Sequence, residues 1–139
     1  MREILFRGRR VDNGEWTEGY YFKAWSLYVG ADYTHFIFNC DRRETYAVVP
    51  ASVCQYMGLT DRNGRKIFEG DICKRITLPL RLEYLFEIRY VPEKCCFLAV
   101  DLDGTNMKFI SDYFNSYYDI EVVGNIFDNR ELLKEEAAE

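Results

Sequence analysis

The sequence predicts a mainly-β fold, an antiparallel barrel or rolled sheet with a short C-terminal helix. Aromatic residues make up 17% of the 139-residue chain, and such side chains favour the pleated, half-buried surface of a strand. Short apolar segments also recur at close spacing, with turn-forming Gly, Asn and Asp between them. The chain has only three prolines and no low-complexity tract, so we expect one domain over residues 1–139.

The first third of the chain predicts strands joined by short turns. The expected elements are a strand at 3–9, a turn at 12–14, a strand at 16–25, a loop at 26–34, a strand at 35–40, a turn at 41–44 and an extended segment at 46–49. Gly19 interrupts the second strand and is a candidate for a bulge. Residues 50–57 are ambiguous, and one interpretation is a short helix that begins at Pro50 and ends at Gly58.

The segment GLTDRNGRKIFEGDI, residues 58–72, contains the clearest turn. Asp and Asn side chains bond nearby backbone groups and Gly supplies a positive φ, so 61–64 predicts a turn into a strand at 66–76 that bends at Gly70. The later expected elements are an alternating strand at 84–90, a turn at 92–94, a strand at 95–102, a hairpin turn at 103–104, a strand end with one helical turn within 107–118, and a strand at 120–127. Asp128 and Glu131 fit a capping box, which predicts a terminal helix that frays over 135–139.

The composition disfavours several classes of partner. The net charge is −5 with a pI near 5.0, which argues against tight nucleic-acid binding because that binding neutralises phosphates. No segment has the length for a signal peptide or a membrane span, and the five cysteines lack a CxxC spacing. We therefore expect a cytoplasmic protein with reduced cysteines and no membrane partner. Two basic clusters are interpreted as solvated strand and turn residues: Arg7, Arg9 and Arg10, and Arg62, Arg65 and Lys66.

An apolar strand that ends in Asp101-Leu102-Asp103-Gly104-Thr105 resembles the first motif of the haloacid-dehalogenase phosphatases. That resemblance implies Asp101 as nucleophile, Asp103 as general acid/base and a bound Mg²⁺. The phosphatase fold is doubly wound, however, and residues 106–139 are too few for its further βα units. We therefore interpret the segment as a strand that enters an Asp-Gly turn, and keep a Mg-dependent phosphatase as the enzymatic alternative.

Two other groups of polar residues lack the partners that a catalytic or metal site needs. His35 is the only histidine, and no partner for it is visible in the sequence. Glu69 and Asp71 flank Gly70 and are interpreted as charges on the rim of a bent strand. We therefore predict no catalytic residue, no metal site and no cofactor.

Three blocks of the sequence resemble the YopX family of phage and prophage proteins. Residues 2–7, REILFR, match the opening element of that family. Residues 55–72, from QYMGLTDRNG to FEGDI, match its central block, and residues 120–133, IEVVGNIFDNRELL, match its closing block. The stretch from 73 to 119 carries no motif specific to the family.

The resemblance implies a mainly-β fold with an SH3-type barrel portion, a phage or prophage setting and no assigned enzymatic activity. The family-signature positions carried over are Gly58, Asp61, Asn63, Gly64, Gly70, Asp71, Gly124 and Asn125. Each of these residue types has a structural explanation in a turn or a bulge. The resemblance therefore implies a set of backbone-directing residues and no catalytic group.

The aromatic residues are more numerous than a core of this size obviously needs, and core packing, a homo-oligomer interface and a ligand site are three explanations for them. Trp16, Tyr20, Trp25 and Tyr117 are the candidate aromatic surface. The first hypothesis is a non-enzymatic accessory protein that self-associates as a homo-oligomer or binds a host or phage protein. The alternative is a small barrel that binds single-stranded nucleic acid by aromatic stacking, which the acidic pI disfavours.

Overall fold

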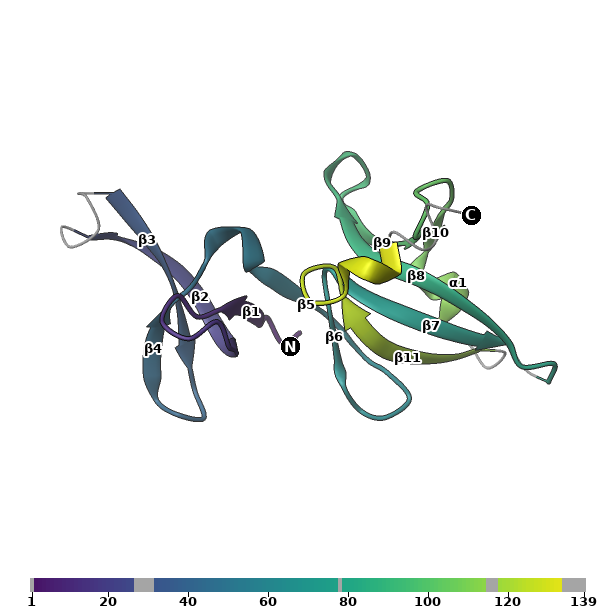
Figure 1. The fold of residues 1–139 in the computed structure, drawn as a ribbon, viewed down its shortest axis with the longest axis horizontal. Coiled ribbons are helices and arrows are strands. Elements are labelled where there is room, and N and C mark those ends of the chain that lie inside the picture. Colours follow the sequence, from purple (N-terminus) through teal and green to yellow (C-terminus); the bar gives the residue numbers. More distant parts are fainter. Residues whose placement is uncertain (1, 27–31, 78, 115–117, 134–139) are drawn as a thin grey trace. The chain divides into compact units, whose positions relative to one another are not determined.

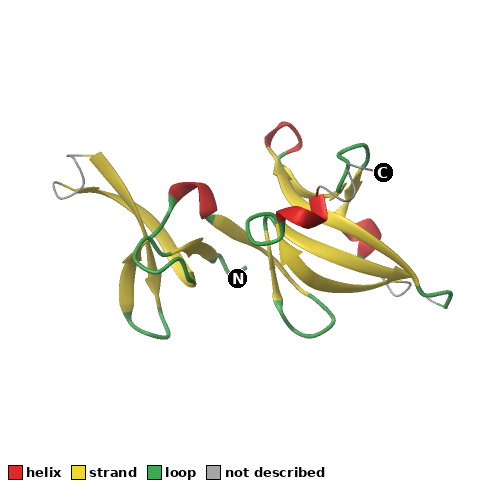
Figure 2. Ribbon diagram, in the orientation of Figure 1, coloured by secondary structure: helices red, strands yellow, loops and turns green. Residues whose placement is uncertain are grey.

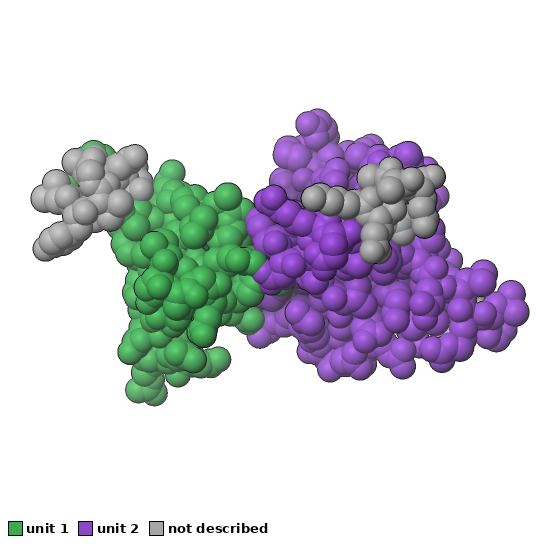
Figure 3. Space-filling view, in the orientation of Figure 1, with its two compact units in different colours: residues 1–58 green, residues 59–139 purple. Residues whose placement is uncertain are grey.

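The computed structural model describes residues 2–26, 32–77, 79–114 and 118–133. The chain divides into two compact units, Met1–Gly58 and Leu59–Glu139 (Figure 3). The strand pairings described within both units are antiparallel. The prediction of a mainly-β, antiparallel fold is confirmed, and one domain over 1–139 stays a prediction.

The strands follow one another along the chain with short helical turns between some of them (Figures 1 and 2). The first elements are β1 (Phe6–Arg9), β2 (Trp16–Ser26), β3 (Asp32–Asn39), β4 (Glu44–Ala47), the 3₁₀ helix η1 (Pro50–Ser52) and β5 (Cys54–Thr60), which ends two residues past Gly58. The later elements are β6 (Lys66–Phe68), β7 (Asp71–Thr77), β8 (Leu82–Val91), the 3₁₀ helix η2 (Pro92–Lys94), β9 (Cys96–Asp101), β10 (Met107–Phe109), α1 (Ile110–Tyr113), β11 (Tyr118–Asn125) and a helix described over residues 130–133.

The first unit is a sheet with the strand order β4-β3-β2-β1-β5. Its core is small: Ile37 is fully buried and Val48 and Cys54 are almost so. Gly8 lies against this core, where an added Cβ would meet Ile37 and Val48 at 3.2 Å. Burying apolar side chains of this size contributes roughly 1.5–3 kcal/mol each.

Gly19 does not form the bulge that the sequence predicts. The ladder between β1 and β2 has no register shift at this residue, which pairs with Phe6. An added Cβ at Gly19 would lie 1.9 Å from the backbone oxygen of Phe38. The glycine is therefore required because the backbone of β3 approaches closely at this point, one of the two reasons for glycine inside a strand.

The segment after Pro50 is a short 3₁₀ helix and then a strand. The helix ends at Ser52, and β5 continues through Gly58, which has a φ of +96°. The interpretation of a helix closed by Gly58 is therefore wrong, because pairing of β5 with β1 extends this part of the chain. The predicted loop at 26–34 is also shorter than expected, since β3 begins at Asp32; residues 27–31 lie outside the described residues.

The second unit contains a five-stranded sheet with the order β10-β9-β8-β7-β11. Its core-facing side chains include Cys73, Phe86 and Ile88, all fully buried. Tyr113 from α1 packs on Phe86 with ring centroids 4.9 Å apart. The alternation predicted over 84–90 is therefore confirmed as a strand whose even-numbered side chains enter the core at its centre and are exposed at its ends.

The terminal helix begins later than the capping box predicted. Asp128 lies in a turn, and its carboxylate accepts a hydrogen bond from the Asn125 side chain at 3.0 Å. The Asn125 Oδ1 in turn accepts the backbone N–H of Asp128 at 2.8 Å. Helical residues start at Arg130, and the Leu132 N–H donates to the Asn129 carbonyl. Asn125 therefore holds Asp128 in the preceding turn; the predicted fraying over 135–139 lies outside the described residues.

Candidate functional site

The Asp61 carboxylate organises the turn of the central block. Its Oδ1 accepts the backbone N–H groups of Asn63 and Arg65, both at 2.9 Å. Its Oδ2 accepts the backbone N–H of Val122 in β11 at 3.0 Å. Burial raises the pKa of Asp61, but these three hydrogen bonds outweigh it and hold the pKa below its usual value of 3.8. The carboxylate is thus a structural acceptor that serves two segments.

The rest of this turn follows the predicted chemistry. Gly64 has a φ of +80°, and its N–H donates to the Asp61 carbonyl at 3.0 Å. Asn63 is exposed at the tip of the turn. The Arg62 N–H donates to the Ile120 carbonyl at 2.9 Å. The predicted turn is therefore confirmed, and it also bonds the backbone of a distant strand.

Gly70 and Asp71 form the sharp bend between β6 and β7. Gly70 has a φ of +85°, its N–H donates to the Ile88 carbonyl, and its carbonyl accepts the Ile126 N–H. The Asp71 carboxylate is completely buried and accepts the backbone N–H of Phe68 at 2.8 Å. The predicted bend is confirmed. The expectation of a rim charge at Asp71 is wrong, because this carboxylate turns inward to bond the strand before it.

Gly124 and Asn125 lie where β11 departs from regular pairing. The register against β7 shifts between Val122 and Gly124. A Cβ at Gly124 would lie 2.4 Å from the Asn129 Oδ1, and that oxygen accepts the Asn125 N–H at 3.1 Å. The glycine thus leaves room for the asparagine that precedes the terminal helix.

The two acids of the phosphatase-like motif lie in an antiparallel hairpin between β9 and β10. The Asp101 N–H donates to the Asn106 carbonyl, and the Gly104 N–H donates to the Asp101 carbonyl. The Asp103 Oδ1 accepts the Thr105 hydroxyl at 2.7 Å and the Thr105 N–H at 3.0 Å, and these bonds lower the pKa of Asp103. The predicted Asp-Gly turn is confirmed, and Asp103 stabilises that turn.

Asp101 lies beside a cluster of tyrosines on the core side of the sheet. Burial and then a hydrogen bond with Asp101 raise the pKa of Tyr84 to about 12. The Arg75 guanidinium lies over the rings of Tyr84, Tyr113 and Tyr118, at 5.0, 4.5 and 4.8 Å from their centroids. Asp101 therefore accepts hydrogen bonds within a packed aromatic and cationic cluster.

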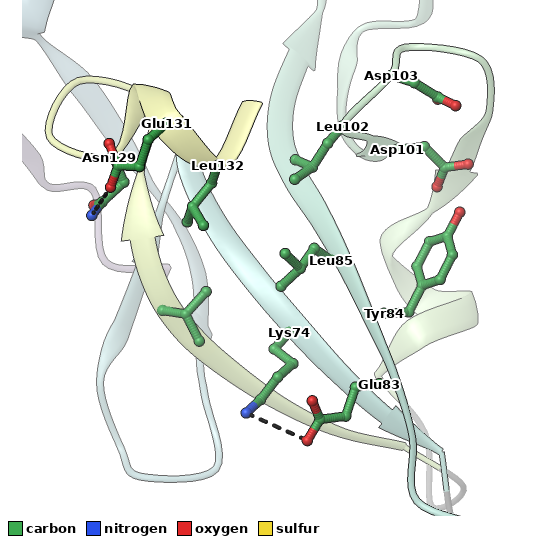
Figure 4. A pocket seen from close by; sticks show the side chains of 11 residues that line it. Lys74, Glu83, Tyr84, Leu85, Asp101, Leu102, Asp103, Asn129, Glu131 and Leu132 are labelled. Carbon is green, nitrogen blue, oxygen red and sulfur yellow. Dashed lines mark hydrogen bonds and ion pairs between the residues drawn. The ribbon is translucent and has the colours of Figure 1, made fainter. Parts of the chain in front are cut away.

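A pocket of about 610 Å³ opens in the second unit between the terminal helix and the sheet. Figure 4 shows Leu85, Leu102 and Leu132 facing a common space, with Lys74 and Glu83 paired at one end. Tyr84, Asp101 and Asp103 form a separate group in the same view. The full lining is Lys74, Glu83, Tyr84, Leu85, Asp101, Leu102, Asp103, Val123, Asn129, Glu131 and Leu132.

The predicted aromatic residues do not form one surface. Trp16 and Tyr20 are an even number of residues apart on β2, so their side chains share one face. Trp25 is an odd number of residues from Tyr20 and therefore lies on the opposite face. Tyr117 lies outside the described residues. Trp16 is half-buried, and the guanidiniums of Arg7 and Arg9 lie 4.9 and 5.2 Å from its ring centroid.

An aromatic ladder that sequence reasoning missed shares the face of Tyr20. It consists of Tyr20 and Phe22 on β2 and of Phe36 and Phe38 on β3. Tyr20 pairs directly with Phe38, and Phe22 pairs with Phe36 with ring centroids 5.3 Å apart. Tyr20 is 55% exposed, Phe22 42% and Phe38 36%. The period-2 pattern of the two strands, combined with their pairing, could have revealed this ladder.

His35 has a local partner, since its Nδ1 lies 2.6 Å from the Tyr21 hydroxyl. The five cysteines all lie in the described ranges, and none of them forms a disulfide. Across the described ranges, no group of three or more His, Cys, Asp or Glu side chains could hold a metal ion. In the same part of the chain, no helix has the length and hydropathy needed to cross a membrane.

Comparisons with known proteins give a family and two similar folds. The family described as YopX protein matches residues 5–134. The crystal structure of protein EF1440 from Enterococcus faecalis is 22% identical with a TM-score of 0.55, over 96% of this chain and 99% of that one. The crystal structure of protein yopX from Bacillus subtilis is 16% identical with a TM-score of 0.55, over 96% and 97%. No curated protein matches the chain.

Proposed function

Because the chain belongs to the YopX family, we propose that it is a non-enzymatic accessory module that self-associates through the aromatic ladder of its first unit. The observation that carries this proposal is the exposure of Tyr20, Phe22 and Phe38 on one sheet face. Adjacent exposed aromatic side chains on one face of a soluble protein are typical of an interaction surface.

The charge on this sheet face favours a protein partner over a nucleic acid. The arginines of the face, Arg7 and Arg9, lie on β1 and stack on Trp16. On β4, Thr45 and Ala47 lie opposite Phe38 and Phe36 and extend the ladder with uncharged side chains. Stacking of single-stranded nucleic acid needs a basic groove along the backbone, whereas the uncharged ladder of Tyr20, Phe22, Phe36 and Phe38 suits a second copy of itself.

Substitution of Tyr20 and Phe22 by threonine tests the proposal. Threonine keeps strand propensity, so the double variant should fold, but it removes two large apolar side chains. Each is worth roughly 1.5–3 kcal/mol on full burial, so the association constant should fall at least about 10-fold. The matched control is Trp25→Thr, which removes a side chain that is 57% exposed on the opposite face.

Light scattering across a concentration series gives the oligomeric mass. The wild type and Trp25→Thr should show the same concentration-dependent mass, and the double variant should reach that mass only at concentrations at least about 10-fold higher. A wild type that is monomeric at all concentrations contradicts the proposal. So does an equal loss of mass in Trp25→Thr, because the opposite face would then carry the contact.

We further infer that the SH3-type portion lies in the second unit. Its five antiparallel strands, the bend at Gly70 and the shift between Val122 and Gly124 support this inference, because bends and bulges are the devices that curl small sheets. The setting proposed with it is the cytoplasm of a bacterium that carries a phage or prophage. Host or phage proteins are the further partners to identify there, by mass spectrometry of what co-purifies.

A further inference from the structure

The pocket of the second unit has an apolar centre built from three separate elements. Leu85 comes from β8, Leu102 from the turn after β9 and Leu132 from the terminal helix. All three are half-buried, and Val123 on β11 is 38% exposed beside them. A pocket of about 610 Å³ falls in the size range of small-molecule sites, which are mostly apolar with a few polar groups.

The charged side chains around this centre are mainly acidic. Four carboxylates line the pocket against the single cation of Lys74. Those of Asp101 and Asp103 belong to the separate group with Tyr84 (Figure 4), and the other two are those of Glu83 and Glu131. The Lys74 Nζ is shared by Glu83 at 3.8 Å and by Glu121 at 3.9 Å. A cleft lined by an excess of one charge concentrates ligands of the opposite charge.

The position of Glu131 gives the ligand an orientation. Glu131 lies on the terminal helix one residue before Leu132 and is exposed. Its Oε1 accepts only a long hydrogen bond among those described, from the Asn129 side chain at 3.3 Å. Figure 4 shows the Glu131 carboxylate beside Asn129, across the pocket from the Lys74–Glu83 pair. Glu131 can therefore receive a cation while the leucines receive an apolar group.

We propose that this pocket binds a small organic ammonium ion. The apolar body lies on Leu85, Leu102 and Leu132, and the ammonium group pairs with Glu131. Asp101 and Asp103 add negative potential without direct contact, since they accept hydrogen bonds of the hairpin turn. The site is in the second unit and is independent of the aromatic ladder, so either proposal can fail without the other.

A matched series of three probes tests the charge preference: 4-phenylbutylamine, 4-phenylbutanol and 4-phenylbutyrate. They share one apolar body and differ only in the terminal group. Titration of the full chain, followed by the methyl resonances of Leu85, Leu102 and Leu132, should show saturable shifts. The amine should bind most tightly and the carboxylate most weakly.

Two variants with opposite effects separate binding from loss of fold. Glu131→Gln should weaken amine binding about two- to five-fold, the size expected for one exposed ion pair, and leave the alcohol unchanged. Lys74→Gln should strengthen amine binding by a similar factor, because it removes the opposing cation. Glu93→Gln changes an exposed acid of η2 outside the pocket and is the control.

Three results would overturn the proposal: equal affinity for all three probes, no saturation within the solubility of the amine, or shifts that map away from the three leucines. An unchanged preference for the amine in Glu131→Gln would also overturn it, because the ammonium would then lie elsewhere. A loss in Glu131→Gln together with a gain in Lys74→Gln supports it, since a misfolded variant cannot gain affinity.

Discussion

At the scale of single residues, the signature positions act through the backbone. Asp61 accepts three N–H groups, two within its own turn and one from Val122 in β11. The two bonds within the turn follow from the Asp-x-Asn-Gly pattern, because they join residues close in sequence. The bond to Val122 spans 61 positions, so no local pattern could predict it. The residue type was therefore predictable and its second partner was not.

We expect Asp61→Asn to destabilise the protein by about 1–3 kcal/mol, because an amide cannot accept hydrogen bonds at both ends and leaves a buried N–H without an acceptor. Urea unfolding measures the change. The matched control is Asp12→Asn, where an exposed carboxylate pairs with Arg10 at the surface. That change should cost under about 1 kcal/mol. Equal effects of the two substitutions would contradict the structural role of Asp61.

The lowered pKa of Asp61 also makes a pH prediction. The folded pKa lies below the usual value of 3.8, so the charged carboxylate stabilises the folded state above that pH. This contribution is lost as the pH falls through the folded pKa. The stability difference between wild type and Asp61→Asn should therefore be constant near neutrality and shrink below about pH 3.8. A difference that grows in acid would show that the sign is wrong.

At the scale of elements, the strands and hairpin turns were easier to predict than the short helices. The hairpin at Asp103-Gly104 and the strand over 84–90 depend on neighbouring residues and were predicted. The segment after Pro50 was not, because its pairing with β1 joins distant parts of the chain. The helix start was misplaced because Asn125 bonds Asp128 and keeps it in a turn. A nonlocal pairing explains the first miss, and a side-chain hydrogen bond across three residues explains the second.

Gly19 gives a prediction at this scale. Gly19→Ala would place a Cβ 1.9 Å from the Phe38 carbonyl oxygen, which forces β2 and β3 apart. We expect a loss of about 3 kcal/mol in the free energy of unfolding. Gly14→Ala is the control: Gly14 has a φ of +73° in an open turn with nothing within 4 Å. It should cost only about 1 kcal/mol, so similar unfolding midpoints for the two variants would refute this explanation of Gly19.

At the scale of the whole molecule, the mainly-β class and the family were predictable, but the faces of the sheets were not. Counting aromatic residues grouped Trp25 with Tyr20, although strand geometry separates them. The ladder partners Phe36 and Phe38 became visible only when the pairing of β2 with β3 was known. Composition therefore indicated an aromatic surface, and register determined which residues form it.

The net charge of −5 gives a prediction that separates two functions. Copies of an acidic chain repel one another, and salt screens that repulsion. Self-association through the uncharged ladder should therefore strengthen between low and moderate salt, as sedimentation equilibrium would measure. Binding to a single-stranded oligonucleotide would weaken over the same range, because counterion release drives it. A self-association constant that falls as the salt concentration rises would argue against the ladder as the contact between copies.

The bonds from the Asp61 turn to β11 also have a consequence for solubility. β11 is the last strand in the order of its sheet, and an outermost strand offers N–H and C=O groups to which another chain can add. The Ile120 carbonyl and the Val122 N–H are already bonded to the turn. The turn at residues 61–64 therefore occupies part of the β11 edge and limits the addition of strands from other chains. Such strand addition is the first step toward amyloid-like fibrils.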